Sequence, residues 1–227
     1  MAVQRALVAS LGFGVVAACS PGKPEPLRSA MTHRPVARMM APQIAWRDGR
    51  FDTSALPAIA RDAAIVIVPL VDGDGGRGYP NLRVEVRDLA DRPITNMQIM
   101  KSNEFETLVP DAVHATPELE SRLAIVNREL ADLAMEHVLV TMKESAPPPD
   151  LAIDFAARGW LAPSGPRCAQ CPPCENPPYV AALYRAEGVD PIVLRIEFKG
   201  TDICWEPGPQ YHVIARKDAS LTSSAGK

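Results

Sequence analysis

Ala63-Ala-Ile-Val-Ile-Val-Pro-Leu-Val71 is the stretch that decides the fold class. Its β-branched and aliphatic residues follow one another without a polar residue between them, which predicts a central strand buried on both faces. Proline has no N–H to give to a strand ladder, so we expect a bulge or a strand end at Pro69.

A second strand is predicted where Leu82-Arg-Val-Glu-Val-Arg-Asp88 alternates apolar and charged residues. Leu82, Val84 and Val86 fall on one face, a pattern typical of a half-buried antiparallel strand. The glycine-rich residues 72–80 predict the loop before it, and residues 94–100 predict a third strand. Together these stretches predict an antiparallel meander.

Further strands are expected on both sides of this meander. Residues 43–51 can form a small hairpin, because Asp48-Gly49 is a typical turn pair. The remaining predicted strands are 137–142, 151–155, 179–184, 192–198 and 211–215.

The long helix of the chain is predicted over residues 117–136. Thr116 suits the N-cap and Pro117 suits the first helical position. The apolar residues that line one face of this helix are Leu119, Leu123, Val126, Leu130 and Leu133. We therefore expect a β-rich α+β fold with antiparallel sheet and one long amphipathic helix.

The composition limits both the core and the partners. Hydrophobic residues make up 47% of the 227 residues but aromatic residues only 5%, so the core should be mostly aliphatic. The formal net charge is −3. A nucleic-acid binder needs a basic face, so we expect no nucleic-acid partner.

The N-terminus is typical of an exported protein. An apolar run from residue 6 to 18 follows Arg5, as in the core of a signal peptide. At about 1.5 Å per residue this run is too short to cross a hydrocarbon layer of about 30 Å. A buried core helix is the alternative, and the Cys-Ser-Pro-Gly sequence that follows at once disfavours it.

Val16-Ala17-Ala18-Cys19 resembles the lipobox of bacterial lipoproteins. The resemblance implies that residues 1–18 are removed and that Cys19 carries the lipid that binds the protein to a membrane. Ser20 stands where an aspartate would favour the inner membrane, which implies the outer membrane, facing the periplasm or the cell surface. The resemblance covers only the N-terminal part and implies nothing about the folded part.

Prolines divide the rest of the chain. Residues 19–42 are expected to form a lipidated, proline-rich tether, with an ordered loop wrapped on the domain as the alternative. The β-meander and the helix occupy 43–144. Pro147-Pro148-Pro149 then precedes a cysteine-containing, β-rich half at 150–216, which can share one core with 43–144, and 217–227 should be a flexible tail.

Four cysteines remain besides Cys19: Cys168, Cys171, Cys174 and Cys204. An even number in an exported protein predicts two disulfides, which would staple the C-terminal half. Any full pairing joins Cys204 to one of the other three. The alternatives are a four-thiolate zinc site, a redox-active Cys171-Pro-Pro-Cys174 pair and an iron–sulfur cluster.

Other candidate chemistry is weaker. Asp72 and Asp74 could begin a calcium loop, but arginines stand at the glycine and glutamate positions of that motif. The acidic stretch 104–120 is expected to be a solvated face, with a glycosidase-like carboxylate pair as the alternative. Trp205 is expected to pack on a disulfide, or else to contact a ligand together with Asp202 or Glu206.

The histidines are His33, His114, His137 and His212. None is spaced like a metal ligand, so each is expected to be a surface residue or to be satisfied by a neighbour.

We therefore expect a lipid-anchored cell-envelope protein that serves as a structural or interaction module, without cofactor, bound metal or catalytic residues. Its partners would be the membrane and an envelope protein. The alternatives are an envelope hydrolase that uses Asp and Glu residues, and a metal or thiol-redox protein at the cysteine cluster. A pocket with two carboxylates, or His212 beside an acid, would favour the enzyme.

Overall fold

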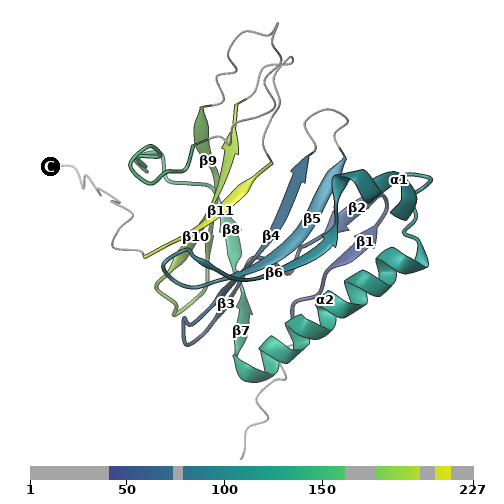
Figure 1. Ribbon diagram of the computed structural model, residues 1–227. Helices are drawn as coiled ribbons and strands as arrows, with labels where there is room; N and C mark the ends of the chain where they lie inside the picture. Colours follow the sequence, from purple (N-terminus) through teal and green to yellow (C-terminus); the bar gives the residue numbers. More distant parts are fainter. Residues whose placement is uncertain (1–40, 74–78, 162–176, 200–207, 216–227) are drawn as a thin grey trace, which may run out of the picture. The chain divides into compact units, whose positions relative to one another are not determined.

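The computed structural model describes residues 41–73, 79–161, 177–199 and 208–215 (Figure 1). Residues 19–40 of the expected tether, the four remaining cysteines and the C-terminal tail lie outside these residues. The strands are β1 (Ala45–Arg47), β2 (Arg50–Asp52), β3 (Ala58–Ala60), β4 (Val66–Gly73), β5 (Pro80–Arg87), β6 (Pro93–Met100), β7 (Leu139–Thr141), β8 (Lys143–Ser145), β9 (Pro178–Arg185), β10 (Ile192–Phe198) and β11 (Gln210–Ile214). The helices are a 3₁₀ turn η1 (Ser102–Glu104), α1 (Phe105–Leu108) and α2 (Pro117–Glu136).

Two larger antiparallel sheets are formed. Sheet 1 has the strand order β6-β5-β4-β3-β7, and sheet 2 has the order β11-β10-β9-β8. Every strand pair in them is antiparallel. The fold is therefore β-rich with antiparallel sheets, as the sequence predicts.

β4 is the central strand that residues 63–71 predict, although it begins later, at Val66. A turn precedes it, in which Ala63 has a positive φ of 57°. The expected bulge or strand end at Pro69 is wrong, because Pro69 pairs with Val84 inside an unbroken ladder. The ladder of β4 with β3 stops at Ile67, so position 69 needs no donor on that side.

The helix α2 spans the residues from which the sequence predicts it. Thr116 is its N-cap, with a side chain that accepts from the Leu119 N–H, and Pro117 opens the first turn. Leu119, Leu123, Val126 and Leu130 are buried against one face of sheet 1, the face that also carries Leu82, Val84 and Val86. Burying such a side chain is worth about 1.5–3 kcal/mol, so this face fixes the helix on the sheet.

Sheet 2 covers the opposite face of sheet 1. Between the sheets lies an inter-sheet core, which contains Ile59, Val66, Val68, Leu70, Met142, Ala182, Tyr184, Val193, Tyr211 and Val213. Met142 connects β7 of sheet 1 to β8 of sheet 2, so one extended segment passes from one sheet into the other. The two predicted parts, 43–144 and 150–216, both contribute to this core.

Residues 151–155 are not a strand, contrary to the sequence prediction. Leu151, Ile153 and Phe155 alternate as expected, but their side chains pack on the outer face of sheet 2 around Trp160. A loop that covers a sheet shows the same alternation as a strand, because every second residue faces the apolar surface. Conversely, residues 143–145 form β8, for which the sequence predicts no strand.

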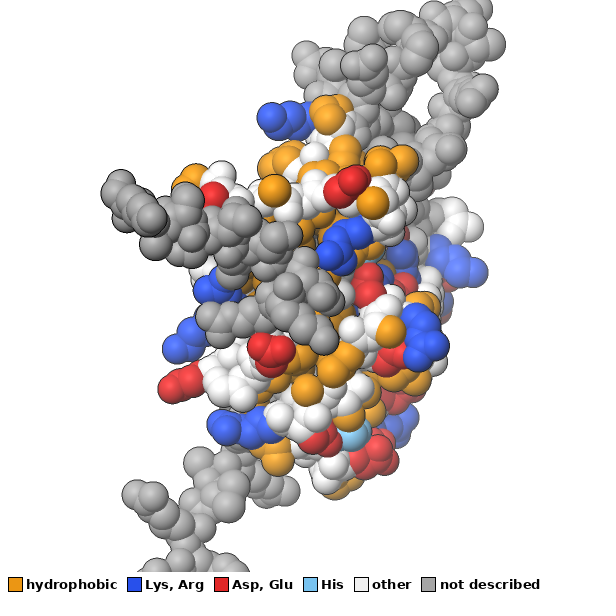
Figure 2. Space-filling model, turned by 90° about the vertical axis from the view of Figure 1, so that its left-hand side faces the viewer, with side chains coloured by type: hydrophobic (Ala, Val, Ile, Leu, Met, Phe, Trp, Pro, Cys, Tyr) orange, Lys and Arg blue, Asp and Glu red, His pale blue; other side chains and the backbone are white. Residues whose placement is uncertain are grey.

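The outer side of sheet 2 faces the viewer in Figure 2, where hydrophobic side chains reach the surface between charged ones. Leu161 and Tyr179 are large hydrophobic residues exposed in this part of the chain.

The N-terminal hairpin β1–β2 forms as predicted, with Asp48 and Gly49 both at positive φ. The segment before it is held on α2: the Asn127 side-chain amide donates to the Ile44 carbonyl and accepts from the Ile44 N–H, both at 2.9 Å. Within the described ranges, no helix has the length and apolar character needed to cross a membrane.

Candidate functional site

The free edge of β11 is covered by side chains rather than by another strand. On one side β11 pairs with β10. On the other side, the Arg87 guanidinium donates to the Tyr211 carbonyl, and the Val213 N–H donates to Asp91 Oδ1 at 2.9 Å. We call this contact between sheet 2 and the β5–β6 hairpin the β11 seam; it comprises Arg87, Asp91, Trp160, Tyr211, His212 and Val213.

Asp91 is placed by the tight turn between β5 and β6. Its φ of 63° lies in the left-handed region, which aspartate tolerates better than most residues. Asp88 holds this turn: its carboxylate accepts the Arg92 and Ala90 N–H groups, both at 2.9 Å. The Arg92 backbone contact is the largest of the influences that lower the pKa of Asp88.

His212 is enclosed by the seam. Its Nδ1 lies 2.6 Å from Asp91 Oδ2, and its Nε2 lies 3.3 Å from Gln210 Oε1. The Trp160 ring stacks on the imidazole at 4.1 Å and 15°, and the Arg158 guanidinium lies 4.9 Å from the Trp160 ring centroid. Only 14% of the His212 side chain is exposed.

The arrangement of His212 and Asp91 has the form of an acid–base pair, since a carboxylate orients the imidazole through Nδ1. In such a pair the other nitrogen, Nε2, must face a nucleophile or a substrate. Here Nε2 faces the Gln210 amide oxygen, and the ring face is covered by Trp160. The contacts of His212 therefore fasten β11 to sheet 1.

A row of charged residues on β5 extends the seam. Glu85 is only 9% exposed and accepts from two of the three Arg87 guanidinium nitrogens, Nε at 3.0 Å and Nη2 at 2.7 Å. Arg83 contacts Glu85 Oε1 at 3.5 Å and donates to Asp72. The sequence predicts a half-buried β5, whereas both of its faces are covered along much of its length. The charges are paired, as buried charges must be.

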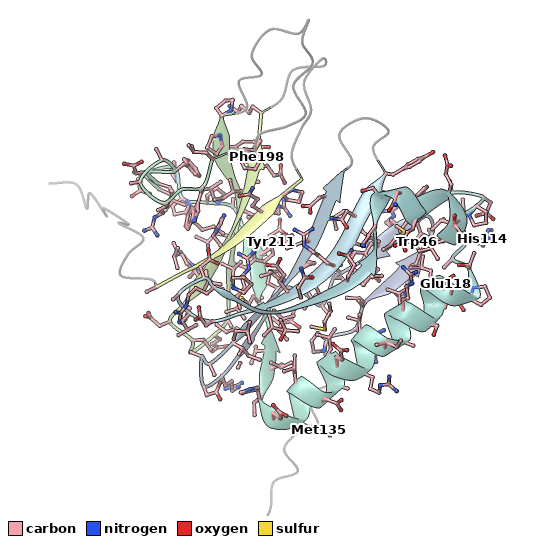
Figure 3. The ribbon with its side chains drawn as sticks, viewed as in Figure 1. Trp46, His114, Glu118, Met135, Phe198 and Tyr211 are labelled. Carbon is pink, nitrogen blue, oxygen red and sulfur yellow. The ribbon has the colours of Figure 1, made fainter. Side chains whose placement is uncertain are left out.

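A second polar cluster lies on the face of sheet 2 that turns toward sheet 1. The Tyr184 hydroxyl donates to Glu144 at 2.7 Å and accepts from Arg195 at 3.0 Å. The Tyr184 and Tyr211 rings are 6.0 Å apart (Tyr211 is labelled in Figure 3). Burial raises the pKa of both phenols. The Tyr184 hydroxyl therefore stays protonated at neutral pH and acts as the hydrogen-bond donor to Glu144.

The acidic stretch does not gather into a carboxylate pair around an open site. Glu104 and Glu118 both bind Arg122, with contacts of 3.0 and 2.7 Å. Arg122 is the first cause that lowers the pKa of Glu104, followed by the Lys101 N–H. Glu106 accepts from the Tyr79 hydroxyl at 2.6 Å.

Asp111 accepts from the His114 N–H at 2.7 Å and lies 2.5 Å from the His114 ring. The His114 N–H is the main cause that lowers the pKa of Asp111. His114 itself is 82% exposed (Figure 3), and His137 lies 3.2 Å from Asp62. These two histidine–acid contacts, and the contact of His212 with Asp91, match the expectation of surface or satisfied histidines. His33 lies outside the described residues.

The remaining candidates are placed as follows. Asp72 is bound to Arg83 and lies 3.4 Å from the Asn81 side-chain nitrogen, while Asp74 lies outside the described residues. Asp202, Trp205 and Glu206 also lie outside them, as do all five cysteines. Among the described side chains, no group of three or more His, Cys, Asp or Glu is arranged to hold a metal ion.

Most of the seam is not predicted from the sequence. The sequence singles out His212, but not Asp91, Arg87 or Trp160, because their partners lie as far as 124 residues away in the chain. The local signal that exists is the Asp88–Arg92 turn, which shows where Asp91 sits but not what it binds.

Comparisons with known proteins give no family for this chain. No family model matches it, and neither a curated protein nor a solved structure is significantly similar to it.

Proposed function

We propose that the chain is a lipid-anchored protein of the bacterial cell envelope whose folded part is a structural or protein-interaction module. The observation that carries the proposal is the sequence Val16-Ala17-Ala18-Cys19 after an apolar run of signal-peptide length. The anchor would be lipid on Cys19, and the location would be the outer membrane. One acyl chain binds a membrane only marginally, so firm anchoring needs at least two.

The geometry of the folded part supports a non-catalytic role. The pKa values of Asp52, Asp62, Asp88, Glu104 and Asp111 are all lowered, mainly by hydrogen bonds from backbone N–H groups or from Arg122. A general acid at neutral pH needs the opposite shift. These carboxylates hold turns, a hairpin and the start of α2 in place.

Mass spectrometry of protein purified from membranes of its native host tests the anchor. We expect an N-terminal peptide that begins at an acylated Cys19, and a Cys19→Ala variant that is neither acylated nor cut before residue 19. An unmodified wild-type N-terminus that still contains residues 1–18 would contradict the proposal.

An envelope hydrolase is the second candidate, because His212 does lie beside an acid, at 2.6 Å from Asp91. The contacts of Nε2 and of the ring face favour the structural role. The two are separated by assaying the full chain and His212→Gln on chromogenic esters, glycosides and peptides. Hydrolysis that disappears in a folded His212→Gln variant would establish the enzyme.

We further propose that two disulfides staple the C-terminal half. The Lys199 N–H donates to the Pro177 carbonyl at 3.1 Å, so the points where the chain enters β9 and leaves β10 lie side by side. Cys174 is three residues from Pro177 and Cys204 is five from Lys199. At about 3.5 Å per residue, chain length permits these two cysteines to meet. A disulfide that closes the loop of about 30 residues between Cys174 and Cys204 would stabilise the fold by about 3–4 kcal/mol on the chain-entropy model.

Thiol titration of the denatured, unreduced protein tests the disulfides. We expect no free thiol before reduction and four free thiols after it. Peptide mapping of the unreduced protein should join Cys204 to one of the three clustered cysteines. Four free thiols would instead point to the zinc or thiol-redox alternatives.

A further inference from the structure

The chain enters the folded part at the end where α2 terminates. The Trp46 indole donates to the Val113 carbonyl just before α2 begins, and Ile44 is bound to Asn127 in the middle of the helix. Residues 46 to 44 thus run along α2 toward its C-terminus. Ala41 lies up to about 10 Å further, and the end of α2 lies about 14 Å beyond Asn127. The described chain accordingly begins beside the C-terminal half of α2 (Figure 1).

Two apolar side chains stand out from this same end. Met135 is 79% exposed and Val138 is 50% exposed. Figure 3 shows Met135 on the last turn of α2, directed away from the sheets. Val138 is fixed in place, since its carbonyl accepts from the Arg61 N–H at 2.9 Å.

The charges around these two residues are mixed. Arg61 is bound through its N–H to the Val138 carbonyl, and Asp62 lies 3.2 Å from His137. Glu136 lies between Met135 and Val138 in the sequence. Such a surface suits zwitterionic headgroups rather than a strongly anionic layer.

We propose that Met135 and Val138 form a contact surface for the lipid bilayer that carries the anchor, with both side chains at the boundary between headgroups and acyl chains. This inference rests on the proposed function. Residues 19–40 would form the link, and even fully extended these 22 residues reach no further than about 75 Å. Such a short link keeps the domain at a high effective concentration near the surface, so weak burial of two side chains suffices for contact.

The test uses the full acylated chain on vesicles of phosphatidylethanolamine with a minority of phosphatidylglycerol. Met135→Trp adds a reporter, and its emission is obtained by subtracting the spectrum of the parent chain, which contains Trp46, Trp160 and Trp205. Ile125→Trp is the matched control, because Ile125 is an exposed apolar residue in the middle of the same helix. Circular dichroism checks that both variants keep the helix.

We expect blue-shifted emission at position 135 and several-fold stronger quenching by brominated lipids than at position 125. If the protein floats with the vesicles but both positions stay in water, the anchor is right and the bilayer contact is wrong. A blue shift at 135 without quenching by brominated lipids means that a protein surface covers Met135, which also overturns the contact. Failure to float with the vesicles overturns the anchor, and the contact with it.

Discussion

Asp91→Asn should weaken the β11 seam by an amount that can be worked out from its contacts. Asparagine keeps the size of the side chain, tolerates the positive φ of position 91 and retains one oxygen for the Val213 N–H. It removes the charge that binds Arg87 at 3.0 Å and His212 at 2.6 Å. Arg87 keeps its contacts with Glu85, so the loss is limited.

Hydrogen bonds to charged groups contribute about 1.5–3 kcal/mol each, so we expect the free energy of unfolding to fall by about 2–3 kcal/mol. For a domain of this size that corresponds to a decrease in Tm of about 5–10 °C. The assay is urea unfolding followed by circular dichroism, with hydrogen exchange of the Val213 amide as a local probe. Asp190→Asn is the control, because Asp190 is exposed in the β9–β10 turn and should change stability by less than about 0.5 kcal/mol.

A double-mutant cycle with Arg87→Gln measures whether the two side chains act together. We expect a coupling energy of about 1 kcal/mol or more, since both residues cover the same strand edge. A coupling energy of zero, or an Asp91→Asn variant as stable as Asp190→Asn, would refute the view that these side chains replace a strand at β11.

Three further changes probe other contacts. Gly208→Ala would place a Cβ 2.4 Å from the Val71 carbonyl oxygen, so it should cost about 1–3 kcal/mol in urea unfolding. Gly159→Asn has open space but a positive φ of 71°, which asparagine tolerates better than most residues, so it should cost less than Gly208→Ala. The stability that the Glu104–Arg122 pair contributes should be fully present above the ordinary Glu104 pKa of 4.5 and should be lost as the pH falls through the lowered pKa of Glu104 in the folded protein, because protonation breaks the pair. Glu104→Gln should therefore make the free energy of unfolding less dependent on pH in this range. An unchanged pH profile in this variant would contradict the assignment. Thr116→Ala should lower stability by about 1 kcal/mol by removing the α2 N-cap, whereas Ser121→Ala, on the exposed face of the same helix, should be neutral within about 0.5 kcal/mol in thermal unfolding.

Local patterns were sufficient for the elements whose reasons are local. Thr116 and Pro117 determine where α2 begins, and Asp48-Gly49 determines the first hairpin turn. The alternation of Leu82, Val84 and Val86 correctly gives the face of β5 that meets α2. In each case the cause lies within a few residues of the effect.

The secondary-structure predictions are wrong where the conformation of a segment depends on contacts with residues distant in the sequence. Residues 151–155 have the alternation of a strand, but their apolar side chains cover sheet 2 and their backbone pairs with no strand. Pro69 fits inside β4 because β3 is too short to reach it. The candidate site shows the same limit: His212 is visible in the sequence, but Asp91 and Trp160 gain their roles only when β11 meets the β5–β6 hairpin.

The seam also has a consequence for the order in which the protein can assemble. Its hydrogen bonds join residues 121 to 124 positions apart, and β11 is made after every other described strand. During synthesis, Arg87 and Asp91 stay hydrated until β11 arrives, while the β4–β5–β6 hairpins can already pair. Contacts between distant segments form slowly, so closure of the two sheets is expected as a late step in folding. A nascent chain that stops before residue 210 would lack Tyr211 and Val213 of the inter-sheet core, and Arg87 and Asp91 would have no strand edge to bind, so this part would stay accessible to chaperones or proteases.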